Sequence, residues 1–279
     1  MSAASEARAA EDGPGWYLYG VVAAEDAPAQ LNAAPAVDPR HEVVVLAEGP
    51  LAGVTSRVSL QEFDESSLPQ RLGDAAWLEE KIRAHEQVLE EVLAIASVVP
   101  CRFCTVYRSE DDLRLFLSER SEALAEALER VAGRVELGVK AFVDRDRFAS
   151  GGALRNESVR ELAERVAGAE GGRAYMESRR LEQLVTDELM RFKGEVGAEL
   201  HARLSGAAED AVTLPAQRPE VSGREEEMLF NGAYLVEDRA RFEQELEAFL
   251  DEHRGDGIEV ELTGPWPPYN FVPAGLGGS

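Results

Sequence analysis

Cysteine is scarce in this sequence, which has only Cys101 and Cys104 among its 279 residues. Two cysteines cannot form a disulfide framework, so an apolar core has to hold the fold together. The sequence has no run of 18 apolar residues, and its first 15 residues lack the basic and apolar segments of a signal peptide. These absences predict a cytoplasmic protein without a membrane span.

Basic residues are also few, since 29 Lys and Arg stand against 53 Asp and Glu and give a net charge of −24. The acidic excess is spread along the chain, because residues 1–133 hold 11 of the basic and 24 of the acidic side chains. Such a surface repels phosphate backbones and anionic headgroups. We therefore expect neither nucleic acid nor a lipid membrane as partner.

Catalytic motifs are missing as well. The sequence contains no Gly-x-Ser-x-Gly, no phosphate-binding Gly-Lys-Ser/Thr and no His-Glu-x-x-His. Its four histidines are single and scattered, without the spacing of a metal site. We expect a protein that is not an enzyme and that holds no cofactor or metal.

The first half of the chain predicts an N-terminal α+β domain over residues 16–133, after a disordered segment 1–15. Apolar and β-branched runs indicate strands, and apolar side chains at steps of three and four indicate helices. Asp74 is a suitable N-cap, and the stripe that follows it includes Leu78, Ile82 and His85. The predicted strands are 16–22, 42–46, 51–58 and 98–107, and the predicted helices are 74–96 and 113–131.

The second half predicts a C-terminal domain over residues 134–272, followed by a disordered end, 273–279. Its strands are expected at 135–143, 211–214, 228–236 and 258–262, with helices at 173–204 and 238–253 and a short inserted helix before them. The order β-α-β-β-α-β is typical of a ferredoxin-like sandwich. The fold class is thus α+β in two domains, the second a modified ferredoxin-like fold with a tail rich in proline and aromatic residues.

Cys101 and Cys104 have the Cys-x-x-Cys spacing of redox and zinc sites. In an extended strand, however, positions i and i+3 point to opposite faces and their Cα atoms lie about 10 Å apart. We therefore interpret both as small buried apolar residues. An enzyme that uses one of these thiols stays as an alternative.

Two further features allow two interpretations each. His85 lies on the apolar stripe of its helix, where a structural hydrogen bond is favoured over a role as general base. The tail Thr263–Phe271 holds three prolines and three aromatic residues. It forms either an aromatic surface for a partner or a segment packed back across its own domain.

Four stretches together resemble the gas vesicle accessory proteins of the GvpF/GvpL family. They are Trp16–Val22; His85-Glu86 with Val98–Val106; Gly172–Met176 with Asn231–Val236; and Gly264–Phe271. The family pattern in the central stretch is similar to Pro-x-Arg-Phe-Gly-Thr. Here Pro100, Arg102, Phe103 and Thr105 keep that pattern, whereas Cys104 stands where glycine is usual.

The resemblance implies a minor component or assembly factor of the gas vesicle, located in the cytoplasm and at the vesicle. It implies contact with the main shell protein, which the chain would keep from aggregating during nucleation, and with other accessory proteins. It brings no catalytic residue. As partner-binding residues we name Arg102 and Phe103 in the central stretch and Trp266, Tyr269 and Phe271 in the tail. The alternative is a ligand-sensing regulatory module, by analogy with other ferredoxin-like folds; the oligomeric state stays open.

Overall fold

The computed structural model describes residues 14–31, 34–63, 68–217, 224, 226–273 and 275. The chain forms two units: one holds the residues up to Val135 and those from Trp266 onward, and the other holds Glu136–Pro265. Residues 134–272 were expected to form the second domain as a whole, but the part of the tail from Trp266 onward belongs to the first unit. Most of the terminal segments expected to be disordered lies outside the described residues.

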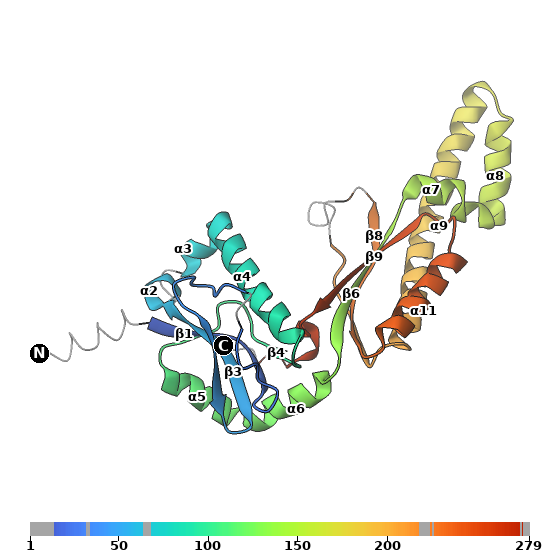
Figure 1. Cartoon of the computed structure of the whole chain (residues 1–279). Helices are drawn as coiled ribbons and strands as arrows, with labels where there is room; N and C mark the ends of the chain where they lie inside the picture. Colours follow the sequence, from blue (N-terminus) through green and yellow to red (C-terminus); the bar gives the residue numbers. More distant parts are fainter. Residues whose placement is uncertain are drawn as a thin grey trace, which may run out of the picture. The chain divides into compact units, whose positions relative to one another are not determined.

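The first unit is a sheet with helices on both faces (Figure 1). Its strands pair in the order β2-β3-β1-β4, and β5 also pairs with β1. The elements are β1 (Pro14–Ala23), β2 (Val43–Glu48), β3 (Leu51–Ser59), α2 (Leu60–Phe63), α3 (Leu68–Leu72), α4 (Ala75–Leu93), β4 (Val99–Pro100), β5 (Val106–Tyr107), α5 (Glu110–Glu119), α6 (Ser121–Val131) and η2 (Tyr269–Phe271). The predicted strand at 16–22 and the hairpin that follows it are confirmed.

Strand β1 is the centre of this unit because both of its faces are buried. Tyr17 and Tyr19 pack in the core with α4, whereas Leu18 and Val21 pack in the core with α5 and α6. A strand covered on both sides is apolar at consecutive positions, which explains its sequence. Gly20 sits at a shift in the pairing with β3, and a Cβ there would lie 2.7 Å from Val98 Cγ2.

The prediction of one strand over residues 98–107 is wrong. Only Val99–Pro100 and Val106–Tyr107 are strands, and residues between them form a turn in which the Thr105 amide donates to the Arg102 carbonyl at 3.2 Å. Cys104 has φ = +66°, a left-handed conformation that no strand residue adopts. The expected separation of about 10 Å between the Cα atoms of Cys101 and Cys104 holds only for an extended strand and therefore does not apply here.

Helix α4 begins as predicted, since the Asp74 carboxylate accepts hydrogen bonds from the amides of Ala76 and Trp77. The predicted apolar stripe is partly wrong. Ile82 is 39% exposed, and the helix instead buries a face that includes Trp77 and Val88. The predicted stripe included Leu78 and Ile82 because both residues are apolar. In the structure they lie at the margin of the buried face.

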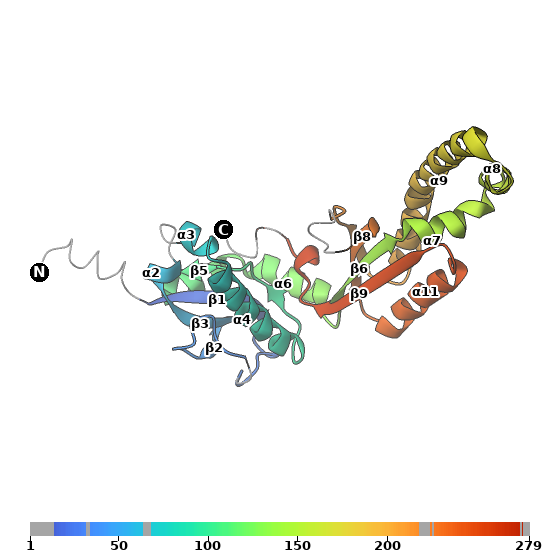
Figure 2. The ribbon, with the colours of Figure 1, turned by 90° about the horizontal axis from the view of Figure 1, so that it is seen from above.

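The second unit combines a sheet in the order β7-β8-β6-β9 with helices (Figure 2). Its elements are β6 (Val135–Val143), α7 (Arg145–Ser150), η1 (Gly152–Arg155), α8 (Glu157–Ala167), α9 (Gly171–Ser205), β7 (Asp210–Thr213), β8 (Glu227–Val236), α11 (Arg239–Glu252) and β9 (Ile258–Trp266). Helices and strands thus follow one another as the sequence analysis expected, with α7, η1 and α8 inserted before the long helix. None of the helices in the described ranges is both long and apolar enough to cross a membrane.

Candidate functional site

A buried histidine in the first unit joins three distant parts of the chain. His85 lies on α4 and is 1% exposed. Its Nδ1 is 2.9 Å from the hydroxyl of Tyr17 on β1, and its Nε2 is 3.0 Å from the hydroxyl of Tyr269 in η2. Both ring nitrogens therefore have hydrogen-bond partners, as a buried polar group requires.

The partners of these two tyrosines fix the direction of each hydrogen bond. The Tyr269 hydroxyl donates to Glu86 Oε1 at 3.0 Å, so its oxygen accepts the proton on His85 Nε2. The Tyr17 oxygen accepts the backbone amide of Cys104 at 3.0 Å, which leaves its own proton for His85 Nδ1. Every member is satisfied when His85 is neutral with its proton on Nε2, a tautomer assigned from these partners.

Burial accounts for the electrostatics of this hydrogen-bond chain. It lowers the pKa of His85 to about 4, because a charged imidazole would lose its hydration. It also raises the pKa of Glu86, and it raises the pKa of Tyr17 well above its ordinary value. A general base needs a free lone pair that faces a substrate, and the only lone pair of neutral His85 is held by Tyr17. The arrangement matches the structural hydrogen bond favoured for this histidine.

Aromatic rings surround the imidazole. The Tyr19 ring stacks on His85 with centroids 5.7 Å apart, and the Phe103 ring meets it edge-on at 5.9 Å. Phe103 also makes an edge contact with Trp77 at 6.4 Å. Ring packing and hydrogen bonds together hold the turn after β4 and the C-terminal segment against α4.

The five residues named as partner-binding lie in different environments. Arg102 is exposed, and Trp266 is 40% exposed. Phe103 and Tyr269 are half-buried in the contacts just described, and Phe271 is only 4% exposed. The tail therefore packs back, but onto the first unit, and the buried ring of Phe271 has no surface to offer a partner.

The cysteines lie beside this cluster and have no reactive character. Both are free; Cys101 is buried and Cys104 is half-buried. Burial raises the pKa of each thiol to about 12, so both are protonated near neutral pH and are poor nucleophiles. Over the described ranges, no group of three or more His, Cys, Asp or Glu side chains could hold a metal ion.

Sequence reasoning missed Tyr17 and Glu86 as members of this site. The signal that could have found them was the set of four family stretches, because three of these stretches contribute to the site. The first contributes Tyr17, the second contributes His85, Glu86 and Cys104, and the last contributes Tyr269. Residues that a family resemblance picks out are thus brought together by the fold into one connected cluster.

This fold of helices and two antiparallel sheets is also that of known proteins. The sequence profile of the gas vesicle synthesis protein GvpL/GvpF family matches residues 15–273. The chain belongs to this family, as the resemblance predicted.

Relatives of both the L and the F type match over most of their length. Gas vesicle protein L of Streptomyces sp. (strain CB03234) is 35% identical over 228 residues, 82% of each chain. Gas vesicle protein F of the same organism is 27% identical, covering 92% of this chain and 98% of its own. The crystal structure of the gas vesicle protein GvpF from Anabaena sp. PCC7120 superposes with a TM-score of 0.66 at 19% identity, over 94% of this chain and 99% of that one. These relatives are named as gas vesicle proteins and not as enzymes.

Proposed function

We propose that this chain is a non-enzymatic assembly factor of the gas vesicle, which binds the small hydrophobic shell protein and keeps it from aggregating during nucleation. Membership of the GvpL/GvpF family supports the gas vesicle role. The same proposal places the protein in the cytoplasm and at the growing vesicle, in contact with the shell protein and with other accessory proteins.

The observation that carries the binding proposal is the exposure of Arg102 and Trp266 next to anchored neighbours. Arg102 precedes Phe103, whose ring packs on His85, and Trp266 precedes Tyr269, whose hydroxyl binds the same imidazole. Arginine and tryptophan contribute strongly to binding when a partner covers them. Because the contacts of Phe103 and Tyr269 with His85 hold the backbone near Arg102 and Trp266 in place, less conformational entropy is lost when a partner binds.

Co-purification with the shell protein tests this surface. The unchanged chain is expected to retain the shell protein in solution, and the double variant Arg102→Glu/Trp266→Ala is expected to retain at least tenfold less of it. Leu115→Ala is the matched control, since Leu115 is an exposed apolar residue of the same unit outside this cluster, 55% exposed. Equal solubility of the shell protein with and without the chain would rule out the proposed role.

We also propose that residues 136–265 form a modified ferredoxin-like sandwich. The sheet order β7-β8-β6-β9 and the order of helices and strands support this assignment, with α7, η1 and α8 as an insertion. A crystal structure of the full chain that places β6 anywhere but between β8 and β9 would contradict it. The pocket described below lies in the first unit and lends no support to ligand sensing by the second.

A further inference from the structure

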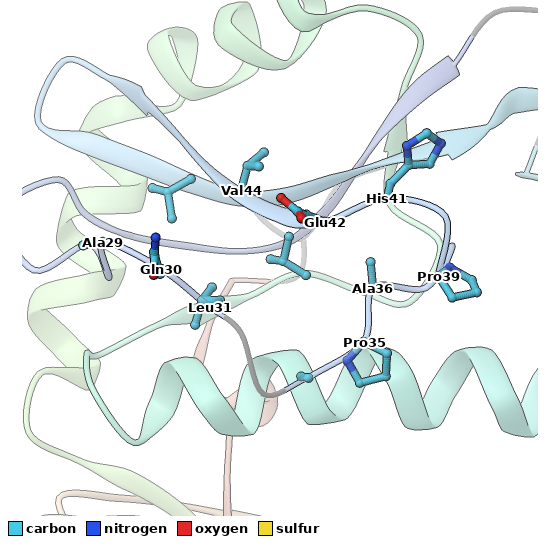
Figure 3. A pocket seen from close by; sticks show the side chains of 12 residues that line it. Ala29, Gln30, Leu31, Pro35, Ala36, Pro39, His41, Glu42 and Val44 are labelled. Atoms are coloured by element: carbon cyan, nitrogen blue, oxygen red, sulfur yellow. The ribbon is translucent and has the colours of Figure 1, made fainter.

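Strand β2 ends the sheet of the first unit, and a cleft runs along its outer edge. The cleft has a volume of about 540 Å³ and lies between β2 and the connecting segment after β1 (Figure 3). Leu31, Pro35 and Ala36 line it from the connection, and Val43 and Val45 line it from the strand. A cleft of this size beside a strand edge has room for side chains of a bound segment.

The register of β2 shows which backbone groups face the cleft. In an antiparallel pair, alternate residues direct both their N–H and C=O groups toward the partner strand or away from it. The Ala47 carbonyl accepts a hydrogen bond from Arg114 Nη1 at 2.8 Å, so Ala47 faces away from β3. By the same alternation, Val43 and Val45 direct their backbone groups to the outer edge.

No other described residue forms a hydrogen bond with the N–H or C=O groups of Val43 and Val45 outside the β2–β3 pairing. Unpaired backbone groups repeated every second residue are the template for an added antiparallel strand. Natural edge strands are usually protected by lysine, proline or a bulge. Strand β2 reads Val-Val-Val-Leu-Ala-Glu and has none of these.

The charge around the edge indicates what kind of segment fits. Glu42 is exposed at the rim of the cleft, and its carboxylate forms no ion pair with any residue in the described part of the chain. The first half of the chain is acidic overall, with 24 acidic against 11 basic residues in positions 1–133. A second copy of this chain would bring the same negative charge to the edge, which opposes pairing of two copies.

We propose that the outer edge of β2 binds an extended segment of a partner protein by strand addition, a segment in which small apolar residues alternate with lysine or arginine. The backbone of the segment pairs with Val43 and Val45. Its apolar side chains enter the cleft over Leu31 and Ala36, and a basic side chain meets Glu42. This inference does not depend on the gas vesicle role.

A synthetic peptide tests the proposal directly. The probe is a fluorescein-labelled hexapeptide of alternating lysine and valine, titrated with the full chain and followed by fluorescence anisotropy. A second peptide carries N-methyl groups on two adjacent central residues, so that neither of its edges can pair fully with a strand. We expect saturable binding of the first peptide and at least tenfold weaker binding of the second. Equal affinities, or no binding of the first at millimolar concentration, would overturn the proposal.

Variants of the strand provide the matching test on the protein side. Val45→Pro removes an outward N–H without breaking the ladder to β3, and is expected to weaken peptide binding at least tenfold. Leu115→Ala changes an exposed side chain on α5, 55% exposed and outside the cleft, and is expected to bind normally. Binding by Val45→Pro equal to that of the unchanged chain would overturn the proposal.

Charge reversal keeps the test valid if the proline variant does not fold. Glu42→Lys is expected to bind the lysine peptide several-fold more weakly and a glutamate–valine peptide several-fold more tightly. An unchanged preference would exclude the assigned partner chemistry. Sedimentation of the unchanged chain and of Glu42→Lys tests the remaining occupant, a second copy of this chain. A self-dimer of the unchanged chain that Glu42→Lys strengthens would assign the edge to a second copy and overturn the proposal.

Discussion

The hydroxyl of Tyr269 lies 3.0 Å from Nε2 of His85, a residue 184 positions earlier in the chain. Between them the chain leaves the first unit, forms the whole of the second and returns. The first unit is therefore completed only by the C-terminal segment. This contact makes the tail a structural part of the first unit, and it can be tested separately from function.

Removal of the Tyr269 hydroxyl is expected to destabilise the first unit. Tyr269→Phe leaves the His85 Nε2 proton and the Glu86 carboxylate without this partner, which costs about 1–3 kcal/mol. Two of the three tryptophans, Trp16 and Trp77, are buried in this unit, and Trp266 is the last residue of β9, so tryptophan fluorescence during urea unfolding reports mainly on the first unit. Tyr175→Phe is the control, because Tyr175 is 66% exposed on α9, and it is expected to unfold like the unchanged chain. Equal stability of all three proteins would contradict the role given to this hydroxyl.

The buried imidazole predicts a loss of stability in mild acid. Burial lowers the pKa of His85 in the folded state from 6.5 to about 4, so the unfolded chain takes up the proton first as pH falls. The contribution of His85 therefore lowers the stability of the folded chain as pH falls from about 6.5 to about 4, by about 3 kcal/mol. Glu86 acts in the opposite sense, since its raised pKa favours the folded state as pH falls.

Urea unfolding at a series of pH values measures this effect. His85→Gln is expected to lose most of the slope between pH 6.5 and 4, whereas the exposed His41→Gln is expected to keep it. A His85→Gln variant whose stability follows pH as the unchanged chain does would show that His85 is not buried in its neutral form.

The left-handed backbone of Cys104 predicts that glycine is favoured there over another small residue. At φ = +66° a Cβ is strained by roughly 1–2 kcal/mol, which glycine avoids. Part of that gain is offset by the greater freedom of glycine in the unfolded chain. Cys104→Gly is therefore expected to be about 1 kcal/mol more stable than Cys104→Ala, since both remove the thiol. A glycine variant less stable than the alanine variant would be inconsistent with this backbone conformation.

The raised pKa values of the thiols predict slow alkylation. With pKa values of about 12, Cys101 and Cys104 are almost wholly protonated at pH 8, and the thiolate is the reactive form. Iodoacetamide followed by mass spectrometry is expected to modify both at least tenfold more slowly in the folded chain than in urea. Rapid modification of either one in the folded chain would reopen the possibility of thiol chemistry.

Local patterns predicted most helices and strands, because β1, the hairpin and the Asp74 cap depend on residues that are close in sequence. They failed at residues 98–107, where Pro100 and Cys101 are as apolar as a strand requires but the backbone turns to place the Cys104 amide against Tyr17. The site itself could not be derived from spacing. Tyr17, His85 and Tyr269 are far apart in the chain, and only the family stretches indicated that they matter together.

Gas vesicle formation in cells tests the central claim most directly. The gene for this chain is deleted in a vesicle-forming host and supplied again unchanged, as Arg102→Glu/Trp266→Ala, or as Leu115→Ala, with urea unfolding of each purified protein as the check on folding. We predict that vesicles are lost on deletion, return with the unchanged chain and with Leu115→Ala, and stay absent or rare with the double variant. Normal vesicle numbers without the chain, or with the folded double variant, would contradict the account.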